Sequence, residues 1–183
     1  MTVTSIPNYV AGTWSLDPAH TEIGFVVRHM MISKVRGHFE KHNATIRTAP
    51  NPADSFVEVE VDLSSITTGN DQRDAHLRSS DFFDVETSPT MTFRSTSIRP
   101  NGEDFLVDGD LTIRDVTRPI TLKVELGGFG PDPYGGIRSG FSATAEINRR
   151  DFGVNWNAAI EGGGVVVSDK VTITIEAEAV LDR

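Results

Sequence analysis

The fold is decided by the stretch Val57-Glu58-Val59-Glu60-Val61-Asp62-Leu63, in which every odd position is apolar and every even position is acidic. Successive side chains of a β-strand point to opposite faces of a sheet, so this alternation predicts a strand with one buried and one solvated face. The same period of two recurs almost to the last residue. It is typical of antiparallel sheets with one wet face, because parallel α/β sheets are covered on both faces.

Five later runs carry the same alternation. Their apolar positions share one parity and are expected to face the interior: Met91 and Phe93, Phe105 to Ile113, Ile120 to Leu126, Phe141 to Ile147, and Val171 to Leu181. Turn-forming residues separate the runs. Pro100-Asn101-Gly102 predicts a tight hairpin, and the glycines and two prolines of residues 127–136 predict a longer loop.

The first half of the chain predicts three more strands and one helix. The strands cover Gly12 to Leu16, a run through Ile23 to Val27, and a run from Lys34 toward Ile46; a bend or short helical turn is expected at residues 29–32. Residues 70–83 do not alternate. Asn70 is a good N-cap there, so we expect a short helix over the rim of the sheet.

These counts predict an all-β protein with about eight antiparallel strands. A sheet of that size with one dry face either closes into a barrel or folds into a sandwich. The long strands after residue 103 favour tilted barrel strands, so an eight-stranded barrel is predicted, with a sandwich as the alternative. No linker-like segment interrupts the 183 residues, which predicts a single domain over residues 1–183.

Composition narrows the function. The formal net charge of -9 argues against nucleic acid or an anionic membrane surface as a partner, since both attract cationic proteins. The chain has no cysteine, which excludes disulfides, thiolate nucleophiles and thiolate metal sites. Residues 1–14 lack the basic start and apolar core of a secretory signal. We therefore expect a cytoplasmic protein without stable membrane insertion.

Catalytic motifs are weak. Ser64 and Ser65 lack the Gly-x-Ser-x-Gly elbow of hydrolases, and Gly128-Phe129-Gly130 precedes prolines rather than a helix. The five histidines all lie in the first half of the chain, and His20 with Glu22 could share a strand face and bind zinc or iron. No His-x-His or His-x-x-x-His spacing supports that site, so neither a metal nor another cofactor is expected. A metal-dependent enzyme that uses these histidines is kept as an alternative.

Small residues on the inward parity raise the question of a cavity. A barrel of about eight strands holds either packed side chains or one small ligand. The small positions are Gly109, Ala143, Ala145, Ala177 and Ala179, and the apolar walls would come from Phe25, Phe39, Phe93, Phe105 and Phe141. Small and large residues also alternate in a packed barrel, which would suit an interaction scaffold. The residues alone leave both interpretations open.

Nine short motifs occur in a fixed order between Asp17 and Gly153: Asp17-Pro-Ala-His20, Arg28-His29-Met30, Val35-Arg36-Gly37-x-Phe39, Arg73-Asp74-x-His76-Leu77, Asp81-Phe82-Phe83-Asp84, Pro89-x-Met91-x-Phe93, Gly109-Asp110-Leu111-Thr112-Ile113, Thr117-Arg118-Pro119 and Asn148-Arg149-x-Asp151-Phe152-Gly153. In this order and spacing the chain resembles the YceI-like family, from Trp14 to the last strand. The resemblance implies a lipocalin-like antiparallel barrel. It also implies non-enzymatic binding of a polyisoprenoid or another long amphipathic lipid in an elongated apolar cavity.

We therefore expect this chain to bind, sequester or transport an isoprenoid or fatty-chain lipid, such as a quinone or a polyprenyl phosphate. Inward parity supplies the apolar candidates for the ligand site, and His29, Arg73 and His76 are expected to orient the head group. The full candidate set is Phe25, Val27, His29, Phe39, Val59, Val61, Arg73, His76, Phe93, Leu111, Ile113, Phe141, Ala143 and Ala145. Exposed sheet edges could also allow a homodimer.

Overall fold

The computed structural model describes residues 6–158 and 165–183. In this part of the chain one α-helix, α1 (Asp71–Arg78), accompanies a large antiparallel sheet. The strands are β1 (Gly12–Leu16), β2 (Glu22–His29), β3 (Ser33–Phe39), β4 (His42–Thr48), β5 (Phe56–Asp62), β6 (Ile66–Thr67), β7 (Thr90–Asn101), β8 (Asp104–Ile113), β9 (Val116–Pro131), β10 (Ile137–Asn148) and β11 (Val167–Leu181). Short 3-10 turns are η1 (Pro18–His20), η2 (Pro52–Asp54), η3 (Leu63–Ser65) and η4 (Arg149–Phe152).

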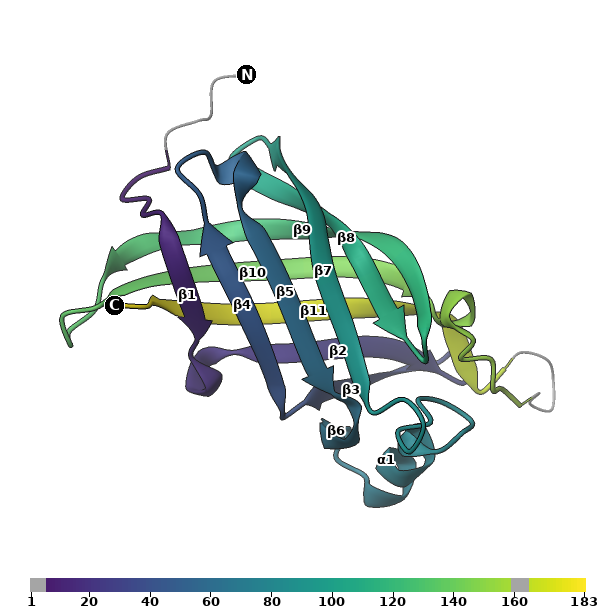
Figure 1. Ribbon diagram of the computed structural model, residues 1–183. Helices are drawn as coiled ribbons and strands as arrows, with labels where there is room; N and C mark the ends of the chain where they lie inside the picture. Colours follow the sequence, from purple (N-terminus) through teal and green to yellow (C-terminus); the bar gives the residue numbers. More distant parts are fainter. Residues whose placement is uncertain (1–5, 159–164) are drawn as a thin grey trace.

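Eight of these strands close into a barrel. They follow the order β1-β4-β5-β7-β8-β9-β10-β11, and β11 returns to β1, where Trp14 pairs with Leu181 and Leu16 with Ala179. Figure 1 shows β9, β10 and β11 crossing behind β1, β4, β5 and β7. The predicted antiparallel eight-stranded barrel is thus confirmed.

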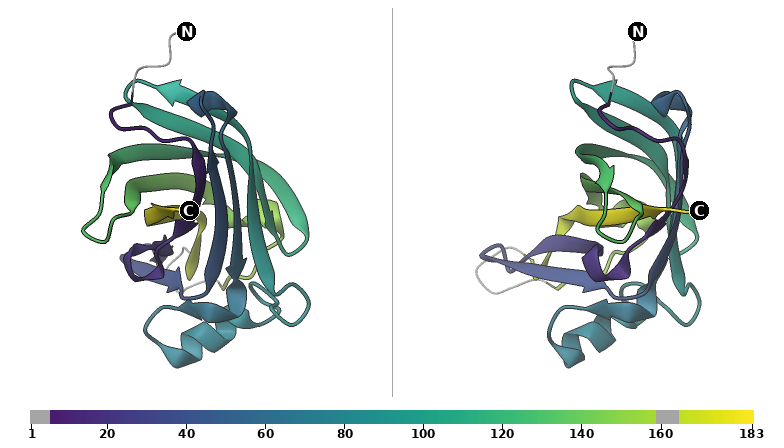
Figure 2. Two further views of the ribbon diagram at one scale, coloured as in Figure 1. Left: turned by 60° about the vertical axis from the view of Figure 1, so that its left-hand side comes forward. Right: turned by 90° about the vertical axis from the view of Figure 1, so that its left-hand side faces the viewer.

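Three strands extend the sheet beyond the ring. The Val167–Glu176 part of β11 pairs with β2, and β3 and β6 follow in turn. Two views in Figure 2 show β2 and β3 continuing away from the barrel wall. The predicted strand from Lys34 toward Ile46 was wrong, because it is two strands, β3 and β4, separated by Glu40 and Lys41. The inward parity changes across that turn, from odd positions such as Phe39 to even positions such as Ile46, and this change marks the break.

Cross-strand pairing explains the alternation. Val59 of β5 lies opposite Phe93 of β7, and Phe93 lies opposite Leu111 of β8, so one apolar row crosses three strands. Phe93 and Leu111 are buried, whereas Glu58 and Glu60 are exposed. Burial of such a side chain stabilises the fold by about 1.5–3 kcal/mol. The parity therefore sorts each strand into a barrel interior and a solvated exterior.

The β7–β8 turn lies where the sequence predicts it, whereas the β9–β10 loop is shorter than predicted. Gly102 has φ +66° in the β7–β8 hairpin, as predicted. The predicted loop over residues 127–136 is shorter, because β9 continues to Pro131 and only 132–136 form the loop. Gly127 instead lets β10 approach closely, since a Cβ there would lie 3.1 Å from the Gly140 carbonyl oxygen. A glycine in a strand can mark such an approach as well as a turn.

The helix begins where the sequence predicts. The Asn70 side chain accepts a hydrogen bond from the Arg73 backbone N–H at 2.9 Å, which caps the first turn. The helix ends at Arg78, where Ser79 donates to the carbonyl of His76, and residues 79–83 continue as turns. The helix is therefore shorter than the 70–83 segment. It lies beside β6 at one end of the barrel (Figure 1).

Candidate ligand-binding cavity

The interior of the barrel is hollow. The space nearer α1, here called the helix-side chamber, has a cavity volume of about 150 Å³, and a second space, the distal chamber, has about 170 Å³. A single water needs only about 10–15 Å³ on the same measure. Four apolar side chains line both chambers, which therefore adjoin: Ile23, Val59, Leu122 and Ile175.

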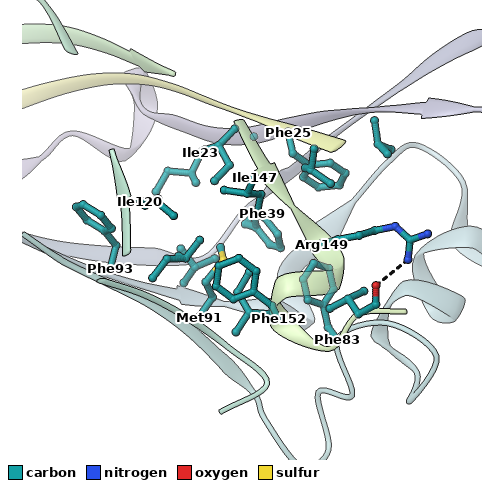
Figure 3. Close-up of a pocket in the computed structure, with 18 of the residues that line it drawn as sticks. Ile23, Phe25, Phe39, Phe83, Met91, Phe93, Ile120, Ile147, Arg149 and Phe152 are labelled. Carbon is teal, nitrogen blue, oxygen red and sulfur yellow. Dashed lines mark hydrogen bonds between the residues drawn. The ribbon is translucent and has the colours of Figure 1, made fainter. Parts of the chain in front are cut away.

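Aromatic and aliphatic side chains form the wall of the helix-side chamber. In Figure 3, Phe39, Phe83 and Phe152 gather with Met91 at one end, and Phe93 lies toward the other. Phe39 packs edge-on against Phe83, with 6.1 Å between ring centroids. Apart from the Arg149 stem and Thr92, every residue of this wall is apolar or glycine. Such a wall offers a ligand burial but almost no hydrogen bonding.

The distal chamber lies at the other end of the barrel. Trp14 and Phe129 meet edge-on there, at 5.5 Å between centroids, and Tyr9 also packs edge-on against Phe129, at 5.3 Å. Phe141 and Ala143 of β10 also line this chamber. It therefore continues the apolar space away from α1.

A third space opens beside α1, and we call it the mouth. Its volume is about 440 Å³, and it shares Phe25, Val27, Leu77, Phe82 and Val167 with the helix-side chamber. Its polar lining is Arg28, His29, Asn70, Gln72, Arg73 and His76. Among the residues that the structure describes, no carboxylate belongs to this lining, although the whole chain carries a charge of -9.

One strand runs past all three spaces. On β11, Ala177 lines the distal chamber, Ile175 lines both chambers, and Val167 lines the helix-side chamber and the mouth. Ten residues of strand at about 3.3 Å each span roughly 33 Å. The three spaces thus form an elongated series that suits a chain-like molecule, and the packed-barrel alternative finds no support.

The structure places the predicted site residues in three groups. Eight line the helix-side chamber: Phe25, Val27, Phe39, Val59, Val61, Phe93, Leu111 and Ile113. Phe141 and Ala143 line the distal chamber, and His29, Arg73 and His76 line the mouth. Ala145 lines none of these spaces, because it packs in the buried core with Ile113 and Phe152.

The small inward residues do not all leave space. Ala143 and Ala177 line the distal chamber, as expected for residues that leave volume unfilled. At Gly109 the space is taken by Phe93, whose ring would lie 2.4 Å from an added Cβ. Ala179 is fully buried in the cluster around Trp14. Inward parity alone does not distinguish a filled position from an open one.

The mouth residues on α1 already have partners. Arg73 donates to the hydroxyl and the carbonyl oxygen of Thr68, both at 2.8 Å, and this ties the helix to the end of β6. His76 Nε2 lies 2.8 Å from Asp81 Oδ2, and its ring packs edge-on against Trp156 at 4.7 Å. Both side chains are therefore held in place beside the opening.

Arg149 is a buried charge that sequence reasoning missed. It is 5% exposed, its stem lines the helix-side chamber, and it donates to the carbonyls of Val154 at 2.8 Å and Ser168 at 2.9 Å. The first of these bonds is the dashed line in Figure 3. Burial lowers the pKa of its guanidinium, and Asp169 opposes this at 3.7 Å. The motif Asn148-Arg149 drew attention to this residue, but arginines at strand ends are normally solvated, so the sequence did not predict that Arg149 is buried beside the cavity.

Other lining residues that the parity argument missed lie outside the regular strands. They are Leu77, Phe82, Phe83, Phe152, Val154 and Trp156. Period-two reasoning says nothing about helix, turn and loop positions, although Asp81-Phe82-Phe83 stood out as a motif. These residues close the α1 end of the barrel.

The histidines do not form the pairing that the metal-dependent alternative considered. His20 does not pair with Glu22; its Nδ1 lies 3.0 Å from Asp17 and 3.2 Å from Glu178, while Glu22 approaches His38. Asp17, His20 and Glu178 make the one group in the described residues with metal-ligand spacing. Arg138 already binds Asp17 at 2.7 Å, and this cation satisfies the acidic charge there. The group is best described as an ion-pair network.

Comparison with known proteins settles the family. The sequence model described as the YceI-like domain matches residues 14–179. The chain belongs to the YceI-like family. Protein YceI of Escherichia coli is 35% identical over 177 residues, which cover 95% of this chain and 90% of the relative.

Solved structures agree with this YceI-like fold. BcnA of Burkholderia cenocepacia superposes with a TM-score of 0.77 at 25% identity, covering 89% of this chain and 98% of BcnA. A polyisoprenoid-binding domain from Saccharophagus degradans superposes with a TM-score of 0.69 at 19% identity, over 92% and 98% of the two chains. The second likeness shows the fold. In the described residues, no helix has the length and apolar character needed to cross a membrane.

Proposed function

We propose that this YceI-like protein binds one long-chain isoprenoid, or a similar amphipathic lipid, and sequesters or carries it without catalysing a reaction. The observation that carries the proposal is the series of adjoining apolar spaces from the distal chamber to the mouth. The structural neighbour named for polyisoprenoid binding supports a binding role for this fold.

Apolar burial would supply the affinity. Each methylene removed from water contributes about 0.8 kcal/mol, and the walls of both chambers are almost wholly apolar. Pre-formed aromatic walls also reduce the ordering needed on binding. A long hydrocarbon chain therefore gains from filling both chambers.

The mouth would hold the head group. Arg28, His29, Arg73 and His76 line it; among the described residues only His76 of these pairs with a carboxylate, that of Asp81, and Arg is suited to phosphate and carboxylate oxygens. This favours an anionic head such as a polyprenyl phosphate over a neutral quinone. The chain would then enter first and the head would remain beside α1.

Cavity filling tests the proposal. Ala143→Phe places a ring in the distal chamber, whereas Thr144→Phe adds the same bulk at the next, exposed position of β10. Purified proteins are loaded with a long polyprenyl phosphate or with geranyl phosphate, and bound lipid is extracted with solvent and measured by mass spectrometry. We expect Ala143→Phe to lose most of the long lipid and to keep the short one. Thr144→Phe should retain both.

Two results would count against the proposal. One is a wild-type protein that holds no extractable lipid and takes up neither probe. The other is an Ala143→Phe variant that is folded by circular dichroism and binds the long probe like the wild type. The second result would place the chain outside the distal chamber.

A further inference from the structure

An exposed apolar patch lies at the tip of the β2–β3 hairpin. Met30, Met31 and Ile32 form this tip and are 37%, 58% and 78% exposed. In the described part of the chain, Tyr134 is the one other exposed large apolar side chain. Single exposed apolar residues are normal, whereas a contiguous group marks an interaction site. We call Met30, Met31 and Ile32 the apolar tip.

The backbone of the tip is unusual for these residues. Met30 has φ +52° and Met31 φ +64°, which is the pattern of a type I′ hairpin turn. Asn-Gly is preferred in such turns, because side chains with φ above zero are strained. Strained positions that persist are concentrated at functional sites. Stability of the turn therefore does not account for two methionines there.

Cations flank the apolar tip. Arg28 pairs directly with Lys34 across the hairpin, and Val26 pairs with Arg36, so the three cations share one parity of the hairpin; Arg28 also borders the mouth. All three are exposed. None of them forms an ion pair within the described residues. The hairpin thus combines an apolar end with unpaired positive charge behind it.

The other face of this hairpin belongs to the cavity. Phe25, Val27, His29 and Val35 line the mouth, so a surface that contacts the tip also lies beside the opening. Figure 2 shows the hairpin of β2 and β3 projecting from the barrel. A lipid bilayer fits both properties, because apolar tips enter its headgroup region and nearby Lys and Arg bind anionic lipids.

We propose that the apolar tip docks on an anionic lipid bilayer and brings the mouth of the cavity to the membrane surface. The contact is peripheral: the three apolar side chains of the tip enter the headgroup region, and Arg28, Lys34 and Arg36 face the anionic lipids. The net charge of -9 does not prevent it, because charges farther than about 8–10 Å from the surface are screened at physiological salt. Docking goes beyond ligand binding and does not require an occupied cavity.

Vesicle sedimentation tests the docking. The full chain is mixed with vesicles of phosphatidylcholine alone or of equimolar phosphatidylcholine and phosphatidylglycerol, neither containing an isoprenoid. We expect binding to the anionic vesicles, weakened by salt. The double change Met31→Ser with Ile32→Ser should reduce the partition coefficient at least about tenfold. Lys34→Gln with Arg36→Gln should reduce it by a similar factor, about tenfold.

Tyr134→Ser is the matched control. Tyr134 is 82% exposed but lies in the β9–β10 loop, and that loop and the hairpin tip are at opposite ends of β11. We expect this variant to bind vesicles like the wild type. Extracted lipid is measured for each variant, so a loss of docking is distinguished from a loss of ligand.

Three outcomes would overturn the docking proposal. The wild type could fail to sediment with the anionic vesicles, or the Met31→Ser, Ile32→Ser variant could sediment as well as the wild type. Light scattering could instead show a dimer that this double variant disperses, and the patch would then be an interface between two copies of the chain. None of these outcomes concerns the lipid content of the barrel.

Discussion

Single residues decide whether interior space is filled or open. Gly109 and Ala143 both have the inward parity of their strands, yet Phe93 covers the first and the distal chamber borders the second. The sequence predicts which side chains face inward, because successive side chains of a strand point to opposite faces of the sheet. It does not predict which are covered, because coverage depends on the rotamer of a residue on a neighbouring strand.

Gly109→Ala tests this distinction. The added methyl group would lie 2.4 Å from the Phe93 ring and 2.6 Å from the carbonyl oxygen of Arg94, so either the ring or the strand must move. We expect the free energy of unfolding, measured with urea, to fall by about 1–3 kcal/mol. At Gly140 the first contact is 3.9 Å away, so Gly140→Ala is the control and should change it by less than about 1 kcal/mol. Equal effects at the two sites would contradict the proposed coverage of Gly109.

At the scale of elements, the side chain of Arg138 links three segments of the chain at one end of the barrel. Arg138 of β10 binds Asp17, which precedes η1, at 2.7 Å; it also binds Asp132 of the β9–β10 loop at 3.0 Å and Glu178 of β11 at 3.4 Å. The hydrogen bond from Arg138, followed by those from His20 and from the backbone N–H of Ala19, lowers the pKa of Asp17 from 3.8 to about 2. The network holds the end of the barrel where β11 closes on β1.

This lowered pKa predicts a pH dependence. Because the folded-state pKa lies below the unfolded value, the stabilising effect is present above pH 3.8 and is lost as the pH falls toward about 2. Carboxyl NMR titration should find the pKa of Asp17 near 2 in the wild type and closer to 3.8 in Arg138→Met. Arg150→Met removes an arginine that binds Asp169 instead, and should leave the Asp17 titration unchanged. A wild-type titration near 3.8 would show that the network does not hold the carboxylate.

Helices, strands and turns could be predicted where residues adjacent in sequence determine them. The β1 bounds, the Asn70 cap and the β7–β8 turn follow from residues adjacent in sequence. The break between β3 and β4 was missed although the inward parity changes from Phe39 to Ile46, because Glu40 and Lys41 carry no glycine or proline turn signal. Leu77, Phe83 and Phe152 were missed as lining residues because α1, the following turns and η4 are brought to the cavity only by the tertiary fold.

For the whole molecule, the barrel class followed from the alternation, and its size from the number and length of the runs. Closure itself depends on β11, which is long enough to pair with β2 over Val167–Glu176 and with β1 over Ala179–Leu181. That pairing joins residues about 165 positions apart and has no local signal. Residues of the same strand line both chambers, so the length of β11 accounts for both the closure of the barrel and the extent of the cavity.

The central claim is that chain length governs affinity because the ligand lies along the barrel interior. Native mass spectrometry with polyprenyl phosphates of increasing length tests it most directly. We predict one lipid per protein, with affinity rising at least about tenfold for each added isoprene unit until the distal chamber is filled, and no further gain beyond that length. Affinity that is absent, or that does not change with chain length, would contradict the account.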